Sequence, residues 1–354
     1  MFVALDATYL VDPHPSGIAI YSHELLDGLA RSHPQDRFLH LYRLKQYRRS
    51  APSAFQNVGR RLLLPLLPPL LPWRQPDVFH ALNQRVDLRP AKHVIATFHD
   101  LFVMTGEYSS ADFRARFAKQ ARHAAKRADL IIAVSAFTKD QVVRQLKVDP
   151  ARVRVVPHGV HLPNNVVPLA QREKIILCVG ALQIRKNVVR LIEAFERLPA
   201  GARDGWKLVL AGSTAGFGAA AIITRIERSM QVMQIQLRGY VTNSDLKDLY
   251  QRASIFAFPS LDEGFGIPVL EAMANGIPVI TSNRSALPEV AGEAALLVDP
   301  YDSDAISAAL LRLINDSELR EKLSQSGMDR AKLFPWERTV RATYSVYSEL
   351  QALK

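Results

Sequence analysis

The chain has 354 residues, of which 48% are hydrophobic and 22% charged, with a formal net charge of +11. This balance is typical of a globular protein and excludes extended disorder, and the length favours two domains over a single core. One cysteine, Cys178, excludes an intrachain disulfide framework and predicts a buried thiol in a reducing compartment. The positive charge leaves three partner classes open, namely nucleic acid, an anionic membrane and a phosphorylated substrate.

No secretory signal or spanning helix is expected from the sequence. The start MFVALDATYL lacks a basic region and predicts a short strand. The most apolar segment, 62–73, carries four prolines, which exclude a membrane-spanning helix. We therefore expect a cytoplasmic protein.

Short apolar runs alternate with amphipathic segments along the chain. The runs predict strands at 2–6, 38–43, 77–82, 93–98, 130–135 and 153–157, and then at 175–181, 207–212, 235–240, 254–259, 278–282 and 295–299. Helices are expected between them, among others at 21–31, 114–127, 188–198, 246–252 and 269–275. This alternation predicts an α/β protein with parallel sheets, and the proline-rich stretch 158–174 predicts a linker between two Rossmann-like domains.

The segment 258–282, FPSLDEGFGIPVLEAMANGIPVITS, is the most informative in the chain. A strand should end before a loop with Glu263, Gly264 and Gly266, and a helix should begin near Pro268 and end at Asn275-Gly276. Glycines allow a ligand to approach the backbone, and the helix start favours an anion such as phosphate. The segment therefore predicts an anion site.

Glu263 and Glu271 are eight residues apart, one in the loop and one inside the helix. Carboxylates accept hydrogen bonds and suit sugar and ribose hydroxyls. The alternative is that Glu263 only favours the helix start and that Glu271 is solvated.

The segment resembles the E-x7-E motif of family-4 retaining glycosyltransferases. Further matches span nearly the whole chain: SGIAIYSHEL, TFHDL and VSAFTKDQ in the first half, and VGALQIRKN at 179–187, 239–260 and 285–300 in the second. The resemblance implies the GT-B fold, in which two Rossmann-like α/β/α domains face each other across a cleft. An acceptor-binding domain is then expected at 1–165 and a nucleotide-sugar-binding domain at 170–336, with a C-terminal helix at about 337–354 crossing back.

The resemblance also implies roles for particular residues. The donor diphosphate would be neutralised by Lys186 and Arg185, the ribose held by Glu271, and the sugar hydroxyls contacted by Glu263. His99 would lie beside the transferred sugar. The remaining donor-binding positions are expected to be Gly17, Gly180, Gly264, Phe265 and Gly266.

One position departs from the family pattern, because Ala181 stands where many members have arginine after the glycine matching Gly180. Arg185 is the expected substitute. Each residue also has a structural interpretation: Arg185 and Lys186 as a solvated helix flank, His99 as a structural hydrogen-bond partner, and Gly17 as a turn. His80 and His158 are interpreted as structural or cleft-lining residues, and Ser135 as a helix cap.

The resemblance implies transfer with retention of anomeric configuration, in which the leaving diphosphate helps to deprotonate the acceptor, with no metal and no other cofactor. The RKN segment resembles bacterial mannosyltransferases of polysaccharide assembly, so GDP-mannose is the first expected donor and a UDP-sugar the second. The sequence Asp302-Ser303-Asp304 is interpreted as a helix cap, not a metal site.

Two other functions stay open at this point. The run Gly216–Ala221 fits the G-x-G-x-x-A pattern of an NAD(P)-dependent oxidoreductase, but three residues separate it from its strand, and the next strand ends without a ribose-binding acid. A non-catalytic nucleotide-sugar-binding protein is the other alternative. Nucleic-acid binding is not expected, since no aromatic RNA-binding pattern is present.

The basic residues are concentrated. From Arg43 to Pro76 there are seven basic residues and no acidic one, with a leucine-rich run at 62–71, and 111–127 is a second basic segment with two phenylalanines. These segments predict peripheral binding to an anionic membrane at the inner face of the plasma membrane, where a glycan or lipid-linked acceptor would be reached. The alternative for 43–76 is a proline-rich loop packed on its domain.

Overall fold

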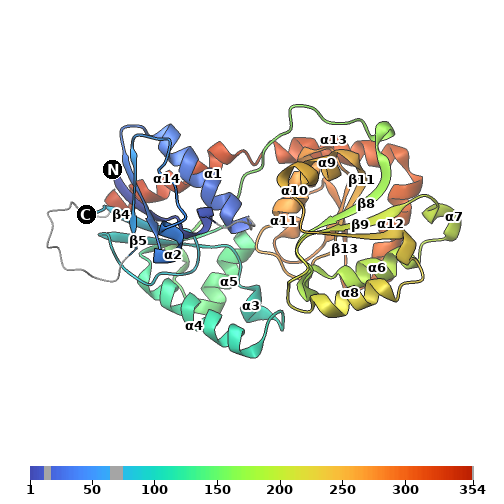
Figure 1. Cartoon of the computed structure of the whole chain (residues 1–354), viewed down its shortest axis with the longest axis horizontal. Helices are drawn as coiled ribbons and strands as arrows, with labels where there is room; N and C mark the ends of the chain where they lie inside the picture. Colours follow the sequence, from blue (N-terminus) through green and yellow to red (C-terminus); the bar gives the residue numbers. More distant parts are fainter. Residues whose placement is uncertain (12–16, 64–74, 353–354) are drawn as a thin grey trace. The chain divides into compact units, whose positions relative to one another are not determined.

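A computed structural model describes residues 1–11, 17–63 and 75–352 (Figure 1). The chain forms two compact units: the first comprises Met1–Thr105, Ala111–Gly159 and Trp336–Lys354, and the second Gly106–Ser110 and Val160–Pro335. The boundary at Gly159 lies inside the stretch 158–174 that the sequence marks as a linker.

The first unit is built on a parallel sheet, in the order β3-β2-β1-β4-β5-β6-β7 over the described residues. Its strands are β1 Phe2–Asp6, β2 Arg37–Tyr42, β3 Val58–Leu62, β4 Val78–Ala81, β5 His93–Phe98, β6 Leu130–Ala133 and β7 Val153–Val155. Its helices are α1 Gly17–Ser32, α2 Leu44–Tyr47, α3 Phe102–Thr105, α4 Ala111–Arg127, α5 Ala136–Leu146 and α14 Trp336–Ala352, with the 3-10 turns η1 Thr8–Val11 and η2 Pro150–Arg152.

The C-terminal helix α14 packs against α1 on one face of this sheet. Leu25 and Tyr347 from the two helices share a buried cluster with Leu5 of β1. A Cβ on Gly28 would lie only 2.4 Å from Val340, so the glycine permits the close packing of the two helices. Alanines of α4 and residues of α5 cover the other face, which completes three layers.

The second unit repeats the plan, with the sheet order β10-β9-β8-β11-β12-β13. Its strands are β8 Glu173–Val179, β9 Lys207–Ala211, β10 Ile235–Gly239, β11 Ala253–Phe258, β12 Val279–Ser282 and β13 Ala295–Val298. Its helices are α6 Val188–Glu196, α7 Ala200–Arg203, α8 Ala219–Glu227, α9 Asn243–Arg252, α10 Ile267–Ala274, α11 Leu287–Ala291, α12 Ser303–Asn315 and α13 Ser317–Ala331, with η3 Leu169–Gln171, η4 Ile184–Lys186 and η5 Val232–Gln234. Figure 1 shows α6 and α8 on one side of this sheet and α9, α10 and α13 on the other.

Both sheets have a doubly wound order. In each, the first strand in sequence lies between the second and the fourth, so the chain leaves it in one direction and later returns on its other side. Ligands in such sheets bind at the carboxyl ends of the two strands that flank this reversal. In the second unit those strands are β8 and β11.

The predicted strands all form, with ends shifted by one or two residues, and Cys178 is a buried free thiol as expected. One strand was missed. Strand β3 pairs in parallel with β2 along Val58–Leu62, so this part of 43–76 is an edge strand, not a loop. Residues 64–74, which hold most of the leucines proposed for membrane contact, lie outside the described part of the chain.

Candidate active site

The candidate site lies in the second unit, where β8 and β11 end side by side. The chain leaves β8 at Gly180 and passes through η4, which carries Arg185 and Lys186, into α6. It leaves β11 at Pro259 and reaches Glu263 before α10 begins. The doubly wound topology therefore brings together two segments that are almost 80 residues apart in sequence.

Asn187 fixes the position of the lysine before it. Its backbone is in the left-handed region, at φ 60°, between η4 and α6. Its side-chain amide donates hydrogen bonds to the carbonyls of Pro259, at 3.0 Å, and Pro300, at 2.6 Å. Asn187 was not among the predicted site residues, although it completes the RKN segment.

Three donors converge on one oxygen of Glu263. Lys186 Nζ lies 2.6 Å, Arg185 Nη1 2.7 Å and Ser260 Oγ 2.7 Å from Glu263 Oε1. Lys186 and Glu263 are each only 8% exposed, and Lys186 Nζ also lies 4.6 Å from the centre of the Phe258 ring. The interpretation of Lys186 as a solvated helix flank is therefore wrong.

The cluster stays ionised although it is buried. Burial opposes ionisation of Glu263, but the charges of Arg185 and Lys186, with hydrogen bonds from Lys186 and Ser260, outweigh it and lower its pKa to about 2. Burial and the charge of Arg185 lower the pKa of Lys186, which Glu263 opposes. Two cations share one carboxylate, so the cluster carries a net positive charge that suits an anion.

Two glycines bring the backbone close to the lysine. Gly180 follows β8 at φ +149°, and a Cβ there would lie 3.2 Å from Lys186 Cε. Gly212 follows β9 at φ +151°, and a Cβ there would lie 2.1 Å from the carbonyl oxygen of Gly180. Larger residues would displace the segment that carries Lys186.

The loop before α10 has the predicted form. Gly266 adopts φ 111° at the helix N-cap, Pro268 lies in the first turn, and Gly276 follows the C-cap at φ +66°. The Phe265 side chain is buried and makes an edge contact with Phe334. Gly264 lies between Phe265 and Glu263, so the loop leads directly from the ion cluster to the helix start.

Glu271, inside α10, has a different partner. Tyr250 of α9 donates a hydrogen bond to Glu271 Oε2 at 2.8 Å. Burial raises the pKa of Glu271, although this hydrogen bond opposes the effect. Among the described residues, no hydrogen bond or ion pair links Glu271 to the Glu263 cluster. Tyr250 was not among the predicted site residues, because nothing in the sequence around it indicates a hydrogen bond to Glu271.

Gly17 and His99 belong to the first unit. Gly17 is the exposed first residue of α1, and His99 follows β5 in a buried position. His99 Nε2 lies 2.8 Å from the Leu82 carbonyl oxygen, and His99 Nδ1 lies 3.3 Å from His158 Nε2. The Tyr21 ring makes edge contacts with both imidazoles.

These contacts define the protonation state of His99. A carbonyl only accepts, so Nε2 of His99 carries the hydrogen and Nδ1 is the acceptor for His158. Burial lowers the pKa of His99 to about 4, although the hydrogen bond to Leu82 opposes the effect. His99 is therefore a neutral ring near pH 7, with both nitrogens bonded within its own unit.

The competing motifs have structural explanations. The glycine run starting at Gly216 follows β9, not β8, and a Cβ on Gly216 would lie only 2.2 Å from the carbonyl oxygen of Leu182. Asp302 caps α12 by accepting from the backbone of Asp304 and Ala305, as predicted. Ser135 likewise caps α5.

Two kinds of site are absent from the described residues. No cluster of three or more histidine, cysteine or acidic side chains is arranged to hold a metal ion there. No helix in the same part of the chain has the length and hydrophobicity needed to cross a bilayer.

Comparison with known proteins agrees with this geometry. Residues 15–163 match the model "Glycosyltransferase Family 4", and residues 164–330 match "Glycosyl transferases group 1". The chain is 31% identical to O-antigen chain mannosyltransferase B of Escherichia coli, over 95% of this chain and 96% of the relative. The chain therefore belongs to the family-4 glycosyltransferases.

Solved structures show the same fold. Sucrose-phosphate synthase from Thermosynechococcus elongatus superposes with a TM-score of 0.78 at 22% identity, over 100% of both chains. Anabaena Alr3699/HepE, solved in complex with UDP and glucose, gives 0.73 at 17% identity, over 98% of this chain and 99% of that chain. This family-4 glycosyltransferase thus has the predicted GT-B fold, and the oxidoreductase alternative is wrong.

Proposed function

We propose that this glycosyltransferase moves a hexose, with retention of configuration, from a nucleotide sugar bound at the Lys186–Glu263 cluster. The observation that carries the proposal is the buried cluster itself, in which two cations share one carboxylate. A diphosphate brings the negative charge that this cluster lacks. Its charge grows as the bond to the sugar breaks, so cations fixed in place stabilise the transition state more than the ground state.

Glu263 has one oxygen left for the sugar. All three neighbouring donors bond Oε1, and among the described residues no donor is bonded to Oε2. A pKa near 2 keeps this oxygen an acceptor at every physiological pH. We assign Oε2 to a hydroxyl of the transferred sugar, with the backbone of Gly264, Phe265 and Gly266 next to it.

Glu271 fits the nucleotide ribose. It lies one turn into α10, away from the cluster, and Tyr250 fixes the orientation of its carboxylate through Oε2. A carboxylate with one oxygen held and one free binds a diol in a defined direction. Tyr250 is then a positioning residue for donor binding.

His99 would contribute by position and not by proton transfer, because both of its nitrogens are already bonded and its ring is neutral. Retention with deprotonation of the acceptor by the leaving diphosphate requires no protein base. Two cations beside the diphosphate would also make a metal ion unnecessary.

The donor sugar is proposed to be mannose, from GDP-mannose, with a UDP-sugar as the second candidate. The support is the relative named as an O-antigen chain mannosyltransferase, which matches this chain over nearly its full length. The structure in complex with UDP and glucose supports the second candidate. The acceptor would be a glycan or a lipid-linked glycan of cell-surface polysaccharide.

Such an acceptor suits binding at the cytoplasmic face of a membrane. Phe113 of helix α4 is 45% exposed, and the same helix carries the exposed cations Arg116, Lys119 and Arg122. An apolar side chain among basic ones is the pattern of interfacial helices. Sedimentation with vesicles tests this: binding only when anionic lipid is present supports it, and equal binding to neutral vesicles contradicts it.

The transfer itself is tested with GDP-mannose labelled with carbon-13 at C1 and methyl α-mannoside as a surrogate acceptor. The product should keep the anomeric configuration of the donor, read from the one-bond C1–H1 coupling, and should form at the same rate in EDTA. An inverted product, or a reaction that stops in EDTA and returns with a divalent metal, would overturn the proposed mechanism.

A further inference from the structure

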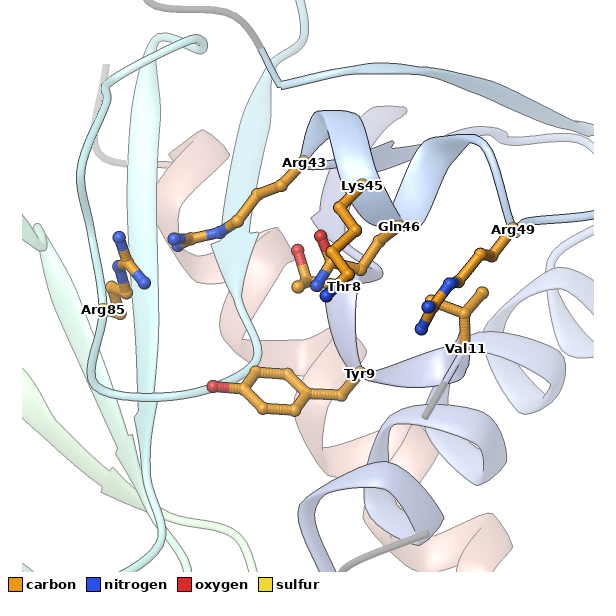
Figure 2. Close-up of a pocket in the computed structure, with 8 residues that line it drawn as sticks. All are labelled: Thr8, Tyr9, Val11, Arg43, Lys45, Gln46, Arg49 and Arg85. Carbon is orange, nitrogen blue, oxygen red and sulfur yellow. The ribbon is translucent and has the colours of Figure 1, made fainter. Parts of the chain in front are cut away.

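The first unit contains a basic cavity of about 380 Å³ that the donor site does not use. Thr8 and Tyr9 of η1 line it together with four cations: Arg43, Lys45 and Arg49 in and around α2, and Arg85 after β4 (Figure 2). We call it the basic pocket. Its size falls in the range of small-ligand sites.

The cations of the basic pocket are only partly neutralised. Asp87 pairs with Arg43, at 3.0 Å, and with Arg85, at 2.8 Å, and the buried Asp6 is the other carboxylate that interacts with these two arginines. Among the residues that the structure describes, four cations and two carboxylates leave an excess of two positive charges. Gathering like charges around one cavity costs free energy unless an anion fills it.

Two further observations indicate which hydrogen-bond donors of the basic pocket could bind a ligand. In the described part of the chain, no carboxylate lies within salt-bridge distance of Lys45 or Arg49. Arg43 Nε is buried and, among the described residues, has no hydrogen-bond partner. A buried N–H without an acceptor is unfavourable, and an oxygen of a bound anion would satisfy it.

We propose that the basic pocket binds a phosphate-type dianion, as a phosphomonoester or a diphosphate. An excess of two charges matches a dianion better than a single carboxylate. Guanidinium groups also match the geometry of phosphate oxygens, which each accept from more than one N–H. The proposal rests on the first unit alone and is independent of the donor, whose cations Arg185 and Lys186 belong to the second unit.

The test uses isothermal titration of inorganic pyrophosphate into the full chain with Lys186→Ala, which removes a cation of the donor site. Pyrophosphate should still bind, and Lys45→Gln with Arg49→Gln added should weaken binding at least about tenfold, as expected for the loss of two charge-assisted contacts. Both side chains are exposed, so their replacement should leave the melting temperature unchanged. Arg31→Gln, an exposed arginine at the end of α1, is the matched control and should bind as before.

Vesicles of phosphatidylcholine with and without phosphatidylglycerol then identify the source of the phosphate. Binding to the anionic vesicles that pyrophosphate displaces, and that the double variant loses, assigns a lipid headgroup. Pyrophosphate binding without such vesicle binding assigns a soluble or glycan-borne phosphate. The proposal is overturned if the Lys186→Ala protein does not bind pyrophosphate, or if Arg31→Gln weakens binding as much as the double variant.

Discussion

The ion cluster around Glu263 predicts a specific dependence of stability on pH. The pKa of the Glu263 carboxyl is lowered from 4.5 to about 2 in the folded chain. A lowered pKa means that the stabilisation is present above pH 4.5 and is lost as the pH falls towards 2. Its size at pH 7 is about 3 kcal/mol, since one pKa unit corresponds to about 1.4 kcal/mol.

Glu263→Gln removes this contribution and leaves Arg185 and Lys186 beside a neutral amide. The variant should therefore be less stable than the natural chain by about 3 kcal/mol at pH 7. At pH 3 the difference should be only about 1 kcal/mol, because most of the stabilisation that comes from the lowered pKa of Glu263 is lost there. Urea unfolding at both pH values, followed by the fluorescence of the buried Trp206 in the same unit, measures the two differences.

Glu227→Gln is the control, because Glu227 is an exposed acid on α8 of the same unit. It should change stability little at either pH. A Glu263→Gln deficit that is the same at pH 7 and pH 3 would refute the electrostatic account of the cluster, since it would show that the loss comes from packing.

Three further predictions follow from single contacts. Lys186→Met should lower kcat/KM for transfer at least about 100-fold, measured with saturating acceptor, because the cation acts on charge that develops in the transition state; an unchanged value contradicts its role. Tyr250→Phe should raise KM for the donor and leave kcat nearly unchanged, because it removes the hydrogen bond that orients Glu271; a loss confined to kcat argues against a ribose contact. Gly212→Ala should lower the melting temperature by several degrees, because its Cβ would lie 2.1 Å from the Gly180 oxygen. An unchanged melting temperature in calorimetry would contradict this, since the backbone around Gly180 would then move aside without cost.

Much of the fold was predictable from local sequence. Buried parallel strands are short continuous apolar runs, and each predicted run forms a strand. Strand β3 was not predicted from the sequence. It lies at the edge of the sheet, and its sequence, Val-Gly-Arg-Arg-Leu, is half exposed and contains two arginines. Pairing with β2, not local propensity, makes it a strand.

The site was predictable where a motif carries it and not where tertiary contact creates it. The glycine loop and Pro268 predicted the start of α10 that the structure shows. The burial of Lys186 could not be read locally, because it depends on Glu263 lying 77 residues away in sequence. Tyr250 and the basic pocket were missed for the same reason, since Tyr250 meets Glu271 across two helices and the pocket residues come from segments far apart in the sequence.

Donor binding tests the central claim most directly. Isothermal titration of GDP-mannose, UDP-glucose and NADH into the natural chain and Lys186→Met should show one nucleotide sugar binding to the natural chain and at least about tenfold more weakly to the variant, as the loss of a charge-assisted contact implies. Equal affinity of the variant for that nucleotide sugar, or binding of NADH alone, would contradict a nucleotide-sugar site at the Lys186–Glu263 cluster.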